Sequence, residues 1–337
     1  MLQNNTTYDY EYDYNYTFLT NSENKVREGI TYMYVVTYSV ILSLGLLLHM
    51  FVICTIICKM KETAATIWFL GLSVTHLVTL LLLPLQIVSA LDDFTWRFAG
   101  ALCKICSYMA FINMHSTALM LAFISVIRCL SGPISRFFCR HGVSTGVVLL
   151  SWVAGGVLST PSLLYRNSED TSFGVLCRDT YRDTGNKEKA VVVNRFLFGW
   201  LCPLFVVFVT SCLMSMKRNR ALIKTSKSYG IIRVMIIAYF LCWLPYHILM
   251  LFKLYAVEYR TVLLTVGIPI GTALSFLNSC LNPIIYIKMG SCKNMGWMQD
   301  AFSTASPGNN QATSEAMAEE DMSLQNAKSG EPEQDDP

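Results

Sequence analysis

The strongest chemical signal in the sequence is an arginine inside an apolar run. Arg195 lies roughly two helical turns before Pro203, among valine, leucine and phenylalanine residues. A guanidinium is a rigid fork of donors that suits a carboxylate, so one interpretation is a site for an anionic ligand group. The other is an arginine that snorkels to the membrane rim with its stem in lipid. Arg166, Lys104 and Lys253 stand at the ends of other apolar runs.

The runs that must position these cations define the fold class. Hydrophobic residues make up 53% of the chain and charged residues only 15%, which is far from the composition of soluble proteins. More than about 18 consecutive apolar residues can cross a bilayer as a helix. The sequence therefore predicts an all-α membrane protein, a seven-transmembrane helix bundle, with runs at roughly 30–57, 66–90, 101–130, 144–165, 190–216, 230–255 and 262–287.

The third run is expected to be the central helix. It carries small polar residues at its middle, and such groups should face other helices instead of lipid. No aspartate or glutamate lies inside any of the seven runs, whereas a proton- or cation-coupled transporter needs such groups near the midplane. An enzyme is not expected either, since no acid, base and nucleophile share a plausible pocket.

Basic residues predict the orientation of the bundle. The connectors after runs one, three and five hold clusters of lysine and arginine, which the positive-inside rule places in the cytoplasm. The N-terminus is then outside and the C-terminus inside. Residues 1–29 contain no apolar signal-peptide core, so the first span should act as an uncleaved anchor. The net charge of +3 is too small to indicate nucleic acid.

The segments outside the bundle are polar. We expect residues 1–29 to be a disordered extracellular tail, 30–289 the seven-helix domain, 290–302 an amphipathic helix on membrane lipid and 303–337 a disordered cytoplasmic tail. Acid-flanked tyrosines in the first tail are candidates for sulfation, although a plain solubilising tail explains them equally well. The N-glycosylation sequons begin at Asn4, Asn5 and Asn15, and the tyrosines are Tyr8, Tyr10, Tyr12 and Tyr14.

Most of the 12 cysteines lie within the spans, where cysteine behaves as a small apolar residue. Cys103 and Cys177 are the two that sit clearly in the oxidising outer compartment, so we predict that they form a disulfide. Cys106, one turn further along the same helical face as Cys103, is the alternative partner.

Several motifs occur in order along runs six and seven. Run six contains Cys242-Trp243-Leu244-Pro245-Tyr246-His247, and run seven contains Asn282-Pro283-Ile284-Ile285-Tyr286. These two motifs are those of the rhodopsin-like G-protein-coupled receptors, which the chain resembles over about residues 30–290. Arg195-Phe196-Leu197-Phe198-Gly199 and Pro161-Ser162-Leu163-Leu164-Tyr165-Arg166 are similar to the chemoattractant group, which includes the chemerin, complement-anaphylatoxin and formyl-peptide receptors.

Four switch positions depart from the family pattern. The acid that normally precedes the arginine of run three is replaced in Ile127-Arg128-Cys129. His49 stands where the family usually has an asparagine, and His76 where it has the aspartate that binds sodium. Ser211 replaces the tyrosine that meets this arginine in the active state. We expect the two histidines to be hydrogen-bonded to neighbours close to Asn282, because two ligands are weak evidence for a metal. No cofactor is expected.

The resemblance implies a plasma-membrane receptor for a chemoattractant-type protein or peptide. Its expected ligand has a basic body, which meets the acidic tail, and an acidic end, which enters the bundle. A G protein of the inhibitory class and an arrestin are the implied partners. The alternatives are a decoy or scavenging receptor with weak G-protein coupling, and a channel or transporter. The implied ligand-binding residues are Arg166, Arg195, Trp243, Tyr246, His247 and Asn113.

Overall fold

The computed structural model describes residues 21–60, 62–130, 132–171, 174–181, 186–221, 227–255 and 263–289. Helices dominate this part of the chain. They are α1 (Asn21–Lys59), α2 (Ala64–Leu80), α3 (Leu83–Leu91), α4 (Gly100–Cys129), α5 (Gly132–Phe138), α6 (His141–Tyr165), α7 (Asn186–Phe196), η2 (Leu197–Leu201), α8 (Cys202–Ala221), α9 (Lys227–Lys253), η3 (Leu263–Gly267) and α11 (Ile268–Met289). Two strands, β1 (Arg166–Thr171) and β2 (Gly174–Asp179), form an antiparallel hairpin.

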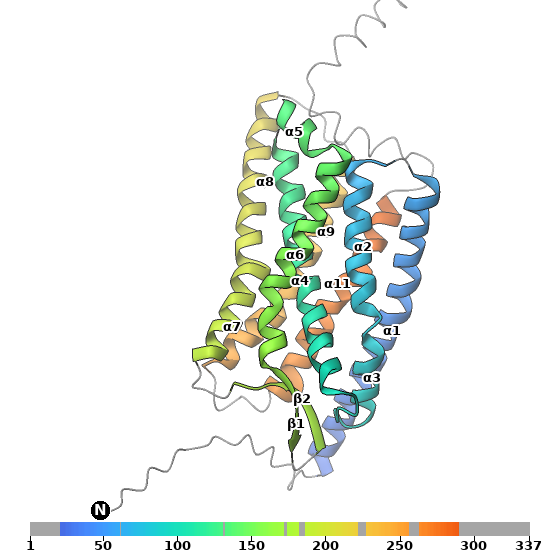
Figure 1. Ribbon diagram of the computed structural model, residues 1–337, viewed down its shortest axis with the longest axis vertical. Coiled ribbons are helices and arrows are strands. Elements are labelled where there is room, and N and C mark those ends of the chain that lie inside the picture. Colours follow the sequence, from blue (N-terminus) through green and yellow to red (C-terminus); the bar gives the residue numbers. More distant parts are fainter. Residues whose placement is uncertain are drawn as a thin grey trace, which may run out of the picture.

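Among the described residues, seven helices are long and apolar enough to cross a membrane. Each coincides with one of the runs predicted from the sequence, which confirms the seven-helix bundle. Figure 1 shows them side by side, with the β1–β2 hairpin at one end and α5 at the other. We call these the hairpin end and the α5 end. The central position predicted for the third run is also confirmed, because α4 is the most completely buried of the seven spans.

Five of the spans contain a proline, and in two of them the helix is irregular beside it. The second span is interrupted at Leu81 and Leu82 and restarts as α3, with Pro84 in its first turn. The fifth span changes to the π-helical turn η2 immediately before Pro203, a local widening that is common at functional sites. Pro161, Pro245 and Pro283 lie inside α6, α9 and α11.

The hairpin is fixed to the bundle by the predicted disulfide. Cys103 in α4 and Cys177 in β2 are bonded, with their Cα atoms 5.7 Å apart, while the alternative partner Cys106 is free and buried. The backbone nitrogen of Trp96 also donates to the Val175 carbonyl at 2.6 Å, and the Trp96 side chain is buried. The hairpin is therefore held from two sides over the mouth of the bundle.

The start of the first helix differs from the prediction. α1 begins at Asn21, so residues 21–29, which the sequence analysis assigned to a disordered tail, are helical. Glutamate, lysine and arginine in this stretch are good helix formers, and the long apolar span that follows supplies the nucleus from which the helix extends backwards. The predicted glycosylation and sulfation positions, the 290–302 helix and the 303–337 tail lie outside the described residues.

Candidate ligand-binding site

Arg195 is buried inside the hairpin end of the bundle. Its side chain comes from the last turn of α7 and is 4% exposed. Nη2 donates to the Ser162 hydroxyl on α6 at 3.2 Å, and the guanidinium carbon lies 3.7 Å from the centre of the Phe111 ring on α4. The interpretation of Arg195 as a snorkelling residue at the membrane rim is therefore wrong, because the side chain points between helices.

Arg195 and Arg166 meet on a single carboxylate. Arg195 Nη1 lies 3.4 Å from Oδ2 of Asp179, and Arg166 Nη1 lies 3.5 Å from Oδ1 of the same residue. Burial by itself would raise the pKa of the Asp179 carboxyl. The positive charges of Arg166, Arg195 and Lys253 outweigh burial and hold that pKa below its ordinary value, so the side chain is a carboxylate at neutral pH.

Sequence reasoning missed Asp179, although a signal was present. Residues i and i+2 of a strand lie on the same face of a sheet. Cys177 must point toward α4 to form its disulfide, and Asp179 follows two positions later in β2. An acid at that position is therefore directed toward the bundle mouth.

The two lysines noted in the sequence have different roles. Lys253, at the end of α9, pairs with Glu188 in the first turn of α7 at 2.7 Å, and both side chains are only 13% exposed. Lys104 instead donates to the carbonyl of Leu163 at 3.1 Å, near the C-terminus of α6, where a helix dipole favours a positive charge. We define the outer ion cluster as Arg166, Asp179, Glu188, Arg195 and Lys253, which carries one positive charge in excess.

Aromatic side chains of α9 lie next to the outer ion cluster and deeper in the bundle. Trp243 and Tyr246 are each 6% exposed, with ring centres 5.8 Å apart, and the Tyr246 ring lies 6.2 Å from Phe111. His247 is buried between the rings of Trp243 and Phe196. Tyr246 also interacts with Arg195, so three of the ligand-binding residues predicted on α9 belong to the same neighbourhood as the two arginines.

Asn113 and Tyr239 are two further buried polar residues on α4 and α9. Asn113 accepts a hydrogen bond from Thr117 at 3.3 Å, an interaction internal to α4. Tyr239, which the sequence analysis did not single out, has a fully buried hydroxyl that donates to the carbonyls of Met114 at 3.0 Å and Gly199 at 2.8 Å. It therefore ties α9 to α4 and η2, one step deeper in the bundle than Trp243.

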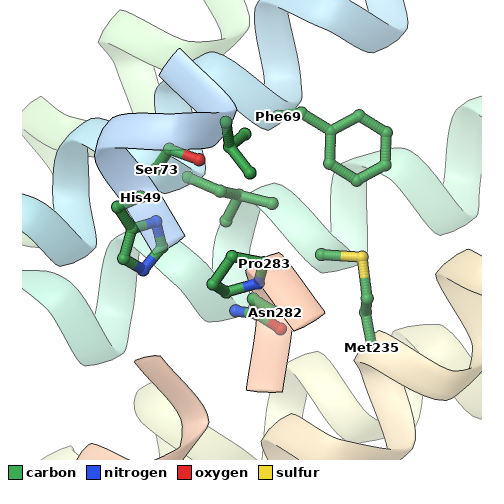
Figure 2. Close-up of a pocket in the computed structure, with 8 residues that line it drawn as sticks. His49, Phe69, Ser73, Met235, Asn282 and Pro283 are labelled. Atoms are coloured by element: carbon green, nitrogen blue, oxygen red, sulfur yellow. The ribbon is translucent and has the colours of Figure 1, made fainter. Parts of the chain in front are cut away.

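A second polar centre lies deeper in the bundle, nearer the α5 end. His49 Nε2 donates to the Ser279 carbonyl at 2.7 Å, and His76 accepts from the Asn282 amide at 2.9 Å. The other ring nitrogen of His76 contacts the Ser279 hydroxyl at 3.0 Å, and the two imidazoles are stacked. We call these four residues the inner network. Figure 2 shows His49, Ser73 and Asn282 around an adjoining cavity of about 10 Å³.

At the α5 end, the switch residues of α4 are buried or half-buried, whereas Ser211 of α8 is exposed. Ile127 is 1% exposed and packs in the core, Arg128 is half-buried, and the Cys129 carbonyl accepts from Lys217 at 2.8 Å. Ser211 is exposed on the outside of the bundle, so it does not point toward α4. The Tyr286 side chain lies outside what the structure describes.

Comparison with known proteins identifies the family. The model of the 7 transmembrane receptor (rhodopsin family) matches residues 25–286. Rat chemerin-like receptor 1 is 36% identical over 283 residues, covering 76% of this chain and 75% of the relative. The human protein of that name is 33% identical, with 76% and 74% covered. A C3a anaphylatoxin chemotactic receptor of Oncorhynchus mykiss is 31% identical, with 80% and 77% covered. These matches do not favour a decoy receptor, a channel or a transporter.

Proposed function

Because the chain belongs to the rhodopsin family of seven-transmembrane receptors, we propose that Arg195 and Arg166 receive the carboxylate of an extracellular protein or peptide ligand. The chain is a multi-pass receptor of the plasma membrane and belongs to the chemoattractant group. The family consists of receptors that couple ligand binding to G proteins, not of enzymes.

The observation that carries this proposal is the convergence of two guanidinium groups on one carboxylate, the buried one of Arg195 and the partly exposed one of Arg166. A buried arginine is strongly disfavoured unless it is paired, and here Arg195 of α7 shares Asp179 with Arg166, the first residue of β1. The geometry already accommodates a carboxylate at the mouth of the bundle. Guanidinium groups in a site of low dielectric bind carboxylates through charge-assisted hydrogen bonds, which are stronger than neutral ones.

The rest of the ligand would meet the N-terminal tail. Residues 8–14 alternate tyrosine with aspartate and glutamate, and this acidic segment would attract a basic protein surface and raise its association rate. The names of the relatives make chemerin and C3a the first ligands to test. A ligand with a basic body and an acidic end would use the tail and the outer ion cluster together.

Transmission of the signal would run through α9. Tyr246 and Trp243 lie on that helix between the outer ion cluster and Tyr239, and Pro245 interrupts the backbone hydrogen bonds beside them. A ligand that changes the position of Tyr246 would therefore shift the population of α9 positions relative to α4 and α11. G-protein activation and arrestin recruitment are the expected consequences at the α5 end.

The test compares synthetic C-terminal peptides of chemerin and C3a as free acids and as amides. The wild-type receptor should prefer the free acid of its ligand. Losing a charge-assisted hydrogen bond costs about 1.5–3 kcal/mol, so Arg195→Gln should weaken binding of the free acid by roughly 10- to 150-fold. Binding of the amide should change much less, because the amide cannot form the ion pair.

Arg178→Gln is the matched control. Arg178 is also in the hairpin region, but its partner is Glu169 at 2.7 Å and its side chain is 36% exposed. This variant should keep the preference for the free acid. If Arg195→Gln retains the wild-type preference at equal surface level, the carboxylate-binding role of Arg195 is wrong.

A further inference from the structure

The structure already contains an occupant of the proposed carboxylate site. We propose that Asp179 is a built-in competitor, which fills the arginine pair in the ligand-free receptor and must be displaced by the carboxylate of the ligand. This inference rests on the proposed function and adds to it the step by which the site opens. It also assigns a role to a residue that the family motifs do not include.

The contacts of Asp179 are those of an occupant that can be replaced. Its two oxygens are divided between two arginines, at 3.4 Å from Arg195 and 3.5 Å from Arg166. Optimal charge-assisted N–H···O contacts are about 2.7–2.9 Å, and an arginine binds a carboxylate best through two parallel hydrogen bonds. A carboxylate on a mobile peptide end is free to adopt that arrangement on Arg195, whereas Asp179 is limited by its backbone.

The backbone around Asp179 is fixed on both sides. Cys177 is bonded to α4, and the backbone nitrogen of Thr180 donates to the Tyr165 carbonyl at 2.7 Å. Asp179 pairs with Arg166 at the last position of the β1–β2 ladder. Displacement therefore needs only rotation of the Asp179 side chain, and the hairpin keeps the carboxylate near the arginines at a high effective concentration.

Charge balance gives the competition its direction. The outer ion cluster contains three cations and two acids, and the second acid, Glu188, is paired with Lys253 at 2.7 Å. Removing the charge of Asp179 leaves Arg166 and Arg195 without their shared carboxylate. This loss destabilises the ligand-free state, in which Asp179 pairs with the arginines. The ligand-bound state is not affected, because the ligand carboxylate has already replaced Asp179 there. The affinity for a carboxylate must therefore rise.

The experiment measures binding of the free-acid peptide and its amide to Asp179→Asn, Asp179→Glu and wild type. Asp179→Asn should bind the free acid roughly 10- to 100-fold more tightly, which corresponds to removal of a competing charge-assisted interaction. The amide should gain little. Asp179→Glu keeps the competing charge and should stay within a few-fold of wild type. Glu169→Gln is the matched control, because it removes an acid of the same hairpin that pairs with Arg178.

The outcomes separate this inference from the proposed function. If Arg195→Gln loses the preference for the free acid but Asp179→Asn binds it no more tightly than wild type, the carboxylate site stands and the competitor role is overturned. If Arg195→Gln keeps the preference, the proposed function itself fails. An equal gain in Glu169→Gln would also overturn the inference, because the gain would then reflect hairpin charge in general.

Poor surface expression of Asp179→Asn does not prevent the test. The double variant Asp179→Asn/Arg166→Gln removes one negative and one positive charge, so the net charge of the outer ion cluster is that of wild type. Arg195 remains to bind the ligand. It should bind the free acid about tenfold more tightly than Arg166→Gln alone. Equal affinity of these two variants would overturn the competitor role.

Discussion

The bundle buries polar groups in two places that follow different rules. The outer ion cluster joins β1, β2, α7 and α9 through full charges, and its Asp179 contacts are 3.4–3.5 Å long. The inner network joins α1, α2 and α11 through two histidines, a serine and an asparagine at 2.7–3.0 Å. In an ion pair, one partner can be replaced by another group of the same charge. Short hydrogen bonds among uncharged groups are strong only with the partners they already have.

This contrast explains where a ligand can act directly. A carboxylate that enters the hairpin end replaces one ionic partner by another, so the arginines remain paired throughout. No comparable exchange is available to the inner network, whose groups would be left unsatisfied if a partner moved away. The outer ion cluster is suited to recognition and the inner network to holding three helices together. Separate perturbation of the two regions tests this division.

The largest effect should come from breaking the disulfide that holds the outer ion cluster. Cys103→Ala/Cys177→Ala releases β2 from α4 and with it Asp179. Loss of a native disulfide costs about 2–5 kcal/mol in small secreted domains, so we expect low surface levels and loss of high-affinity ligand binding. Surface staining and ligand binding at equal surface level measure the two effects.

Cys106→Ala is the control for this change, because Cys106 is buried one turn away and is not bonded. It should retain near-normal binding. If the double alanine variant binds the free-acid peptide as wild type does, the hairpin does not position the outer ion cluster. The outer ion cluster would then not be the region that recognises the ligand.

An intermediate effect is expected from the inner network. His76→Leu leaves the Asn282 amide and the Ser279 hydroxyl without the ring nitrogens that they contact. Unsatisfied buried groups cost about 1–3 kcal/mol each, so thermal stability of the purified receptor should fall clearly while the acid-over-amide preference stays unchanged.

His141→Leu makes the same chemical change at the surface. The His141 side chain is 59% exposed and pairs with Glu62, and such substitutions usually alter stability by less than about 0.5 kcal/mol. Equal melting temperatures for His76→Leu and His141→Leu would show that the inner network does not stabilise the bundle.

The smallest expected effect is that of sodium on ligand affinity. The residue at the position of the sodium-binding aspartate is His76, which offers a ring nitrogen, whereas hard cations prefer oxygen ligands and a negative charge. Replacing about 150 mM sodium by choline at constant ionic strength should change the affinity less than twofold. His76→Asp should make the affinity sodium-dependent. A clear sodium effect on the wild-type chain would contradict the inference that the inner network offers no sodium site.

The sequence alone determined the parts of this molecule that depend on local properties. Hydropathy predicts the seven spans because each helix must satisfy its own backbone in lipid, and the compartment of Cys103 and Cys177 predicts their bond. Arg195 stood out because an arginine in an apolar run is costly wherever it points. None of these features requires knowledge of which helices are neighbours.

Only the tertiary structure decided how the polar residues are paired. Arg195 and Asp179 are 16 positions apart in sequence, and the disulfide and strand register bring them together across the mouth of the bundle. The same holds for Lys104, which caps α6 instead of joining the outer ion cluster, and for Ser211, which faces away from α4. Ion pairs and buried hydrogen bonds depend on distances of a few ångströms between separate elements, and those distances are fixed by packing, not by spacing along the chain.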